Sequence, residues 1–223
     1  MFRTLLFIPG NNRRFIEKAK LLNADIICFD LEDSVPLNEK QTARDFVSEA
    51  LDKKEDFGNR NVYVRINSYE SGIAIQDLDA IVSDEIDGVV IPKVNNQSEI
   101  NHLTLRLIEL ERKKAMSKKI GIMASIESAQ GLVNSYSIAT ADSRVKMLVF
   151  GVFDFLNDMG LDYVQDGIEY SFARAKIPID ARAAGIGAID AIWQKVDDVE
   201  GLVQDASTAK RLGYQGKCVI HPK

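Results

Sequence analysis

A chain of 223 residues with 46% hydrophobic residues can bury one sizeable core, so we expect a single domain. The formal net charge is −5, and no block of lysines and arginines would follow a phosphate backbone, which excludes nucleic acid as an expected partner. The apolar start ends at Pro9-Gly10, too short for a signal peptide or a membrane span, so we expect a cytoplasmic protein. Cys28 and Cys218 lie within apolar runs, which predicts buried thiols rather than a disulfide or a zinc site.

Short β-rich apolar runs alternate with longer amphipathic stretches, a pattern typical of repeated β-α units around a parallel sheet. The runs begin at Thr4, Asp25, Val62, Gly88, Ile120, Lys146, Ala188 and Lys217, and the run at Ala188 is the weakest. Eight such strands predict an α/β fold of the (β/α)8 TIM barrel type over residues 1–223. An open doubly wound sheet is the alternative, but no glycine-rich nucleotide loop follows the first strand, which favours the barrel.

The segments between the strands carry helical signals. One apolar stripe consists of Ala43, Phe46, Val47, Ala50 and Leu51, and a second consists of Ile100, Leu103, Leu107, Ile108 and Leu110. Asn11 or Asn12 can cap the helix after the first strand, and Gly213 stands where a left-handed residue would end the last helix.

In a β/α barrel the active site forms at the carboxyl ends of the strands, so polar residues that end the apolar runs are the first candidates. Six of the eight runs end in this way. In chain order the candidates are Asp30, Glu32 and Asp33; Arg65 and Asn67; Pro92 and Lys93; Ser125, Glu127 and Ser128; Gly151 and Asp154; and His221 and Pro222. We place Pro92 and Lys93 among the residues expected to contact substrate.

Glu127 and Asp154 follow neighbouring strands, and two carboxylates at one mouth repel unless a cation lies between them or one takes a proton. Hard oxygen ligands without histidine or cysteine favour Mg²⁺ over zinc, with positions left for water and substrate oxygens. The alternative is that each carboxylate caps the following helix or pairs with a surface lysine.

Arg65 ends a strand where the alternation would otherwise continue with an apolar residue, so its guanidinium needs an anion. A substrate carboxylate would serve, and so would a structural ion pair with Glu32 or Asp33. Closely spaced carboxylates push their pKa values apart, which makes Glu32 and Asp33 candidates for a general base. Asp30 lies within the strand and is expected to have a structural hydrogen-bonding role.

Basic residues are concentrated on the helix after the first strand: Arg13, Arg14, Lys18 and Lys20. A phosphorylated carrier arm could approach the barrel mouth at this point. A solvated helix face is the alternative explanation, because charge runs on barrel helices are ordinary.

Taken together, the strand ends resemble those of the citrate lyase β subunit-like lyases of the HpcH/HpaI aldolase/citrate lyase superfamily, which include malyl- and citramalyl-CoA lyases. The matching stretches follow the family's order across almost the whole chain. They are RTLLFIPGNNRRFIEKA at Arg3, DIICFDLEDSVP at Asp25, VRIN at Val64, IPKV at Ile91, SIESAQGLVN at Ser125, FGVFDFLNDMG at Phe150, IDARAAGIGAID at Ile179 and LGYQGKCVIHP at Leu212.

The resemblance implies that Glu127 and Asp154 hold Mg²⁺ and that Arg65 grips the carboxylate of a 2-keto acid such as oxaloacetate, glyoxylate or pyruvate. The implied reaction is a retro-Claisen-type cleavage, or the reverse, of a 3-hydroxyacyl thioester such as citryl-, malyl- or citramalyl-CoA. Binding energy from positioned charges would lower the barrier of such a reaction.

The resemblance further implies that Phe7 and Gly10 line the thioester entrance. Arg14 and Lys18 would then meet phosphates of coenzyme A or of the phosphopantetheine arm of an acyl carrier protein. Members of this family commonly form homotrimers or assemblies built from them, so a homotrimer is expected.

The chain departs from the family pattern in two places. The pattern usually continues for several dozen residues beyond the stretch at Leu212, whereas this chain stops at Lys223, and Phe7 stands where some relatives have tyrosine. Two further hypotheses therefore stay open. One is a metal-dependent aldolase acting on free 2-keto acids, and the other is a shortened, non-catalytic paralogue that binds keto acid and Mg²⁺ as a regulatory or partner subunit.

Overall fold

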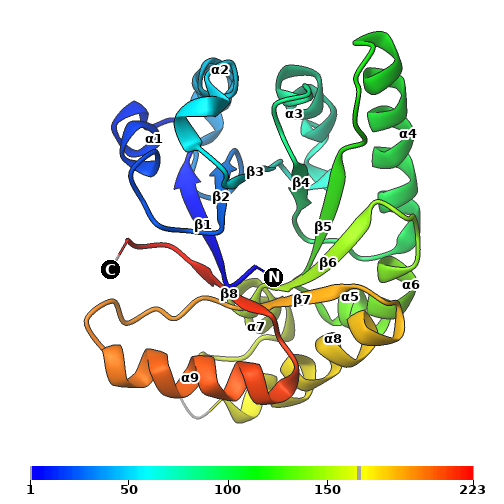
Figure 1. Ribbon diagram of the computed structural model, residues 1–223. Coiled ribbons are helices and arrows are strands. Elements are labelled where there is room, and N and C mark those ends of the chain that lie inside the picture. The colour runs from blue at the N-terminus through cyan, green and yellow to red at the C-terminus, as the bar shows by residue number, and fades with distance from the viewer. Residues whose placement is uncertain (1, 165–166, 223) are drawn as a thin grey trace.

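The computed structural model describes residues 2–164 and 167–222, which form a closed barrel of eight parallel strands (Figure 1). Each strand pairs with the next in the sequence, and β8 pairs with β1 to close the ring. This confirms the TIM barrel and excludes the open sheet. The strands are β1 (Thr4–Pro9), β2 (Ile26–Asp30), β3 (Asn61–Arg65), β4 (Gly88–Ile91), β5 (Gly121–Ile126), β6 (Val145–Phe150), β7 (Gly187–Asp190) and β8 (Gly216–Val219).

Helices surround the strands, with α1 to α4 on one side of the barrel in Figure 1 and α8 and α9 on the other. The helices are α1 (Arg13–Ala19), α2 (Lys40–Leu51), α3 (Ala74–Ile81), α4 (Gln97–Lys113), α5 (Ala129–Val133), α6 (Ser135–Ala139), α7 (Val152–Met159), α8 (Ser171–Ala183) and α9 (Val199–Leu212). Short 3-10 turns are η1 (Leu37–Glu39), η2 (Lys54–Phe57), η3 (Tyr69–Ser71) and η4 (Ile168–Tyr170).

The predicted helix ends are confirmed. Of the two asparagines, Asn12 caps α1, because its side chain accepts a hydrogen bond from the backbone N–H of Phe15. Gly213 ends α9 with a φ of 105°, a left-handed conformation that glycine adopts without a steric penalty. On α4 one member of the predicted apolar stripe was wrong: Ile108 is exposed, whereas its neighbours in the stripe are buried.

The core has two layers, as a closed barrel requires. A small cluster fills the barrel interior and contains Leu5, Ile26, Cys28, Tyr63, Val90, Met123, Met147, Val149, Ile189 and Cys218. A larger cluster packs the outer faces of the strands against the helices. Because both faces are covered, β2 and β5 are buried at every position, and both cysteines are buried and free, as the apolar runs around them predicted.

The side of the barrel at β7 and β8 is joined to the helices by a buried cluster of four charged side chains. Asp190 at the end of β7 accepts two hydrogen bonds from Arg174, at 2.6 and 3.0 Å, and one from Lys217 at 2.5 Å. Asp205 on α9 lies 2.7 Å from Arg174 and 2.6 Å from Lys217. Two carboxylates therefore face two cations, and we call these four residues the balanced cluster.

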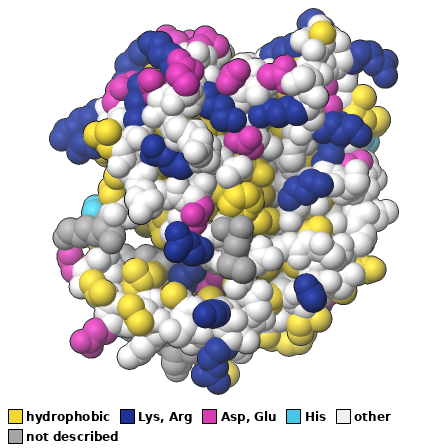
Figure 2. Space-filling model, in the orientation of Figure 1, with side chains coloured by type: hydrophobic (Ala, Val, Ile, Leu, Met, Phe, Trp, Pro, Cys, Tyr) yellow, Lys and Arg dark blue, Asp and Glu magenta, His cyan; other side chains and the backbone are white. Residues whose placement is uncertain are grey.

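The outer surface carries charges of both signs. On the face shown in Figure 2, lysine and arginine side chains are interspersed with aspartate and glutamate side chains over the upper helices. Within residues 2–164 and 167–222, no helix combines the length and the apolar character needed to cross a bilayer.

Candidate functional site

A cavity of about 340 Å³ lies at the carboxyl ends of the strands, where barrel active sites form. Its polar lining comes from the ends of β2, β3, β5 and β6, and consists of Asp30, Asp33, Ser34, Arg65, Ser125, Glu127 and Asp154. Its apolar lining includes Phe7, Val149, Phe150, Phe153, Ile192 and Ile220. The structure therefore brings together the three residues that matter most to the predicted site: Arg65, Glu127 and Asp154.

The local sequence explains how the two carboxylates reach this cavity. Glu127 directly follows β5, and the neighbouring strand β6 ends next to Gly151. A Cβ atom on Gly151 would lie 2.5 Å from Cγ of Glu127, so only glycine leaves room for this side chain. Helix α7 then begins at Val152 and carries Asp154 in its first turn, where the helix dipole favours a negative charge.

Glu127 is a buried carboxylate without enough positive charge around it. Its side chain is 5% exposed, and its Oε2 atom has no hydrogen-bond partner among the described residues. Burial, together with the nearby charges of Glu32 and Asp154, raises the pKa of Glu127 to about 8. A buried acceptor in this state is costly unless a proton or a cation satisfies it.

These properties fit a hard divalent cation held by Glu127 and Asp154. Asp154 is half-exposed, so water can reach the oxygen atoms on its side of the site. The described residues contain no group of three or more histidine, cysteine, aspartate or glutamate side chains in metal-binding arrangement. Magnesium commonly binds through one or two carboxylates and keeps several waters, so two carboxylates beside an open cavity suit it better than zinc.

Arg65 ends β3 and is fixed by Asp30, a carboxylate that was not predicted to be its partner. Its Nε and Nη2 atoms each donate to Asp30 at 2.7 Å, which makes a bidentate pair. Nη1 lies 3.2 Å from Glu32 and 3.6 Å from Asp33, so the expected structural ion pair is also present. The guanidinium stands 4.8 Å from the centre of the Phe7 ring and still lines the cavity.

Asp30 has the structural hydrogen-bonding role expected for it. Its carboxylate accepts hydrogen bonds from the backbone N–H groups of Glu32 and Ser34 and from the Ser34 hydroxyl. Burial alone would raise the pKa of Asp30, but the charge and hydrogen bonds of Arg65 outweigh burial, so its pKa lies below the ordinary value. Asp30 therefore stays ionised and holds Arg65 at the cavity wall.

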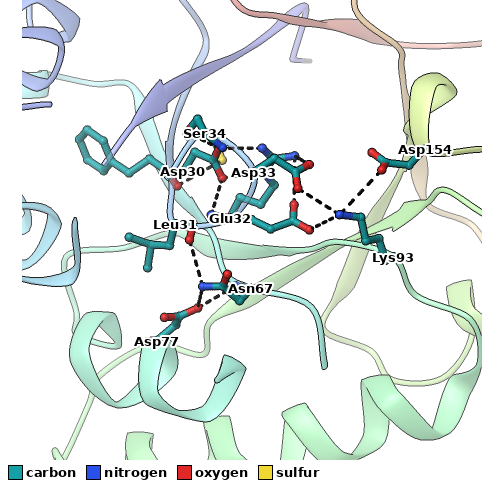
Figure 3. Close-up of polar contacts among 12 residues, drawn as sticks. Asp30, Leu31, Glu32, Asp33, Ser34, Asn67, Asp77, Lys93 and Asp154 are labelled. Atoms are coloured by element: carbon teal, nitrogen blue, oxygen red, sulfur yellow. Dashed lines mark hydrogen bonds and ion pairs between the residues drawn. The ribbon is translucent and has the colours of Figure 1, made fainter. Parts of the chain in front are cut away.

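Glu32, Asp33 and Lys93 form a group at the rim of the mouth (Figure 3). Lys93 Nζ donates to Oε1 of Glu32 at 2.7 Å and to Oδ1 of Asp33 at 3.1 Å, and lies 3.8 Å from Oδ1 of Asp154. Burial raises the pKa of Glu32 to about 7, although the positive charges of Arg65 and Lys93 act to lower it. A carboxyl group that titrates near neutrality is suited to proton transfer.

Other strand-end candidates have structural surroundings. Asn67 is buried, and its side-chain amide donates to the Leu31 carbonyl and to Asp77 (Figure 3). Asp77 also pairs with Arg44. Gly10 is packed against β2, since a Cβ atom there would lie 2.8 Å from the Asp30 carbonyl oxygen. These contacts fasten the loops that carry the site.

Two further groups of residues were predicted to contact the substrate or its carrier arm. Pro92 is buried directly after β4 and precedes Lys93. Arg14 and Lys18 are exposed on α1, and their side chains form no ion pair within the described part of the chain. In contrast, Arg13 pairs with Glu49, and Lys20 pairs with Glu17 and Asp56.

Apart from Phe7, the apolar wall of the cavity was not predicted from the sequence. Ile192 follows β7 and Ile220 follows β8, and both line the cavity together with Val149 and Phe150 of β6. The predicted strand at Ala188 was too long, because β7 ends at Asp190 and leaves Ile192 in the loop. Had apolar residues at strand ends been considered beside polar ones, Ile192 and Ile220 would have been candidates.

Comparison with known proteins places these features in a family. The chain matches the HpcH/HpaI aldolase/citrate lyase family over residues 3–222. It is 37% identical to citrate lyase subunit beta of Leuconostoc mesenteroides, and the aligned region covers 99% of this chain and 73% of that protein. It is 34% identical to (3S)-malyl-CoA thioesterase of Cereibacter sphaeroides, with the same coverage of both chains.

Solved structures give the same result. The citrate lyase beta subunit of Mycobacterium tuberculosis complexed with oxaloacetate and magnesium superposes with a TM-score of 0.78 at 26% identity, covering 99% of this chain and 92% of that one. The CitE protein of M. tuberculosis in complex with magnesium, acetoacetate and coenzyme A also superposes with a TM-score of 0.78, and 77% of that chain is covered. By its sequence and by its barrel, this chain therefore belongs to the HpcH/HpaI aldolase/citrate lyase family.

Proposed function

We propose that this chain is a magnesium-dependent carbon–carbon lyase that cleaves or forms a 3-hydroxyacyl thioester. The substrates we infer are citryl-, malyl- or citramalyl-thioesters of coenzyme A or of an acyl carrier protein, and the products are a 2-keto acid and acetyl thioester. The observation that carries this proposal is that Glu127, Asp154 and Arg65 line one cavity at the barrel mouth. Relatives with related activities, and one that binds oxaloacetate with magnesium, support it.

Glu127 and Asp154 are the residues that we assign to the metal. When bound there, Mg²⁺ would supply positive charge to the carboxylate and hydroxyl oxygens of the substrate. Glu127 would contribute the oxygen that has no hydrogen bond, and Asp154 would contribute from the rim of the cavity. Because Glu127 lines the cavity, we also assign it a contact with the substrate.

Arg65 is the residue that we assign to the carboxylate of the keto acid. A guanidinium has five N–H donors, and two of them are taken by Asp30. Nη1 lies in ion pairs with Glu32 and Asp33, but among the described residues Arg65 donates hydrogen bonds to Asp30 alone. Its other N–H groups can therefore donate to a substrate carboxylate at the cavity wall. Asp30 thereby orients Arg65 without neutralising its capacity to bind an anion.

We assign the proton transfers to Glu32 and Asp33. Asp33 lines the cavity, and Glu32 lies behind it with a pKa near neutrality. This pair removes the hydroxyl proton of the substrate, and the oxygen becomes the carbonyl oxygen of the keto acid as the carbon–carbon bond breaks. The electron pair of that bond passes to the α-carbon of the thioester, and the acid pair returns the proton to this carbon. In the reverse reaction the same groups return the proton to the new hydroxyl oxygen.

The thioester half of the substrate requires an apolar entrance and a site for phosphates. Phe7 lines the cavity next to Arg65, so we infer that it faces the acyl group, while Gly10 lets the chain turn tightly from β1 into α1. Pro92 and Lys93 border the opposite rim. We assign Arg14 and Lys18 to phosphates of the carrier arm, because their side chains form no ion pair with any residue that the structure describes.

The test is turnover by the purified protein with Mg²⁺ on citryl-, malyl- and citramalyl-CoA, with the released keto acid measured by a coupled dehydrogenase. We expect activity on at least one of them, and an Arg65→Lys variant should lose about a hundredfold because it cannot form the bidentate contacts. Absence of turnover on all three, in protein that binds oxaloacetate and Mg²⁺ by calorimetry, would instead support a non-catalytic keto-acid-binding subunit. Turnover of free keto acids that coenzyme A does not inhibit would support an aldolase.

We further infer that residues 1–223 act as one lyase domain in the cytoplasm, as a homotrimer. The family resemblance supports the trimer, and the two buried free cysteines suit a reducing compartment. Light scattering should then give three times the chain mass of 24.8 kDa.

A further inference from the structure

Lys93 is placed between the proposed acid pair and the proposed metal site. In Figure 3 its ammonium group stands between Glu32 and Asp33 on one side and Asp154 on the other. The distances from Nζ are 2.7 Å to Glu32, 3.1 Å to Asp33 and 3.8 Å to Asp154. Glu32 and Asp33 also face Arg65, whereas Lys93 is the cation that reaches Asp154 among the ion pairs of the described residues.

The backbone at Lys93 is unusual. Its φ is 53°, and only one other described non-glycine residue, Ala115, has a positive φ. Side chains other than glycine and asparagine resist this left-handed conformation, and residues held in it are concentrated at functional sites. The strand before it and a hydrogen bond from the Val94 N–H to the Ser125 carbonyl at 3.2 Å hold the turn in place. The strained turn directs the lysine over the mouth.

The positive charge of Lys93 should weaken the binding of a divalent cation at the neighbouring site formed by Glu127 and Asp154. Carboxylate oxygens of Glu32 at 2.7 Å and of Asp33 at 3.1 Å accept hydrogen bonds from Lys93 Nζ and stabilise its charged ammonium form. It repels a second cation nearby, and it pairs with Asp154, one of the two residues that we assign to the metal. It also adds attraction for a substrate that arrives with negative charge.

We propose that Lys93 is a positioning residue that weakens the hold of Glu127 and Asp154 on a divalent cation, so that tight metal binding requires the anionic substrate. This inference rests on the proposed function and deepens it. Through Asp154 and the acid pair, Lys93 couples the metal site to the keto acid site. The metal then exchanges readily while no keto acid is bound. When the substrate binds, its carboxylate adds back the negative charge that Lys93 offsets.

The experiment measures binding of Mn²⁺ alone, by electron paramagnetic resonance, to the full chain and its variants. Lys93→Met removes the charge at similar length, and we expect its Kd to fall about tenfold or more. Lys93→Arg keeps the charge and should stay within about threefold of the unchanged protein. A tighter Kd in Lys93→Met that Lys93→Arg does not share supports the proposal, because a merely structural role would weaken binding in both.

Unchanged or weaker Mn²⁺ binding by Lys93→Met would overturn the proposal, and Lys93→Gln provides a second charge-removing variant should Lys93→Met fold poorly. Glu127→Gln identifies the ion site, since it should abolish binding. If the unchanged protein itself binds no Mn²⁺, or if Glu127→Gln binds it equally well, the metal assignment fails and this inference fails with it. If Glu127→Gln loses binding but Lys93→Met leaves the Kd unchanged, only the inference about Lys93 fails.

Discussion

Two groups of charged side chains in this barrel differ in their balance of positive and negative charge. In the balanced cluster, Asp190 and Asp205 face Arg174 and Lys217, and every charge has an opposite partner within 3 Å. At the mouth, the described residues include five carboxylates, and two cations form ion pairs with four of them; the carboxylates are Asp30, Glu32, Asp33, Glu127 and Asp154, and the cations are Arg65 and Lys93. Lys40 lies beside this group but donates to the backbone carbonyls of Leu31 and Glu32.

The difference separates a structural role from a functional one. A compensated buried cluster fixes how helices sit on strands and leaves nothing for a ligand to satisfy. An excess of negative charge in a cavity is costly in the free protein, and a cation that binds there recovers that cost. The comparison therefore predicts opposite effects on folding and binding when a charge is removed from each group.

The largest effect is expected at Glu127. Glu127→Gln should lower the rate on the best thioester by about a thousandfold or more, because the metal and its charge would be lost from the reacting oxygens. The metal-free variant should be at least as stable as the unchanged protein, since an unsatisfied buried carboxylate is removed. Steady-state kinetics and chemical denaturation in EDTA measure the two quantities. Glu17→Gln, which changes one exposed charge, is the control and should alter neither.

Removing a charge from the balanced cluster should act on folding instead. Asp190→Asn leaves the two cations Arg174 and Lys217 facing the single carboxylate of Asp205, and is expected to lower the free energy of unfolding by ~3 kcal/mol. The control is Asp79→Asn, which breaks an exposed pair with Arg106 and should cost less than about 1 kcal/mol. Mn²⁺ affinity of folded Asp190→Asn should be unchanged, and a large loss would show that the two groups are coupled.

The imbalance at the mouth also predicts a pH dependence. The pKa values of Glu32 and Glu127 rise in the folded protein to about 7 and about 8, so the native state keeps protons there that the unfolded chain has already lost. Stability of metal-free protein should therefore fall by a few kcal/mol as the pH rises from about 5 to about 8, and level off above that. Denaturation in EDTA across this range tests the slope. Glu127→Gln should make the slope shallower, because only Glu32 would still release its proton in this range. An unchanged slope in this variant would contradict the raised pKa of Glu127.

Much of this arrangement could be predicted from the sequence because it depends on local patterns. The eight apolar runs predict the barrel, and the barrel alone places residues that follow β2, β3, β5 and β6 at one mouth. That is why the amino-acid pattern alone is enough to group Arg65, Glu127 and Asp154. Gly151 was also among the strand-end candidates, but the sequence does not reveal why a glycine is needed there. The structure shows that it leaves space for the side chain of Glu127.

The features that could not be predicted depend on contacts between side chains that are far apart in the sequence. Three carboxylates lie close to Arg65 in the sequence of β2 and the loop after it. Arg65 forms its bidentate pair with Asp30 because the register of β2 against β3 sets these two residues opposite each other. Lys93 adopts a left-handed conformation that is usually predicted from a glycine or an asparagine, and here the residue is a lysine. The balanced cluster joins α8, α9, β7 and β8, whose pairing no single segment encodes.

The smallest effect is expected on α1, where the same contrast between paired and unpaired charges recurs at the surface. Replacing Arg14 and Lys18 together with glutamine should raise KM for a CoA thioester about tenfold and leave kcat unchanged, because only phosphate attraction is lost. Replacing Arg13 and Lys20 with glutamine removes the same charge from the same helix, but these side chains already pair with Glu49, Glu17 and Asp56. We expect KM of this control to change by less than about threefold. Equal changes in both double variants would mean that the net charge of the helix, and not a phosphate site at Arg14 and Lys18, attracts the substrate.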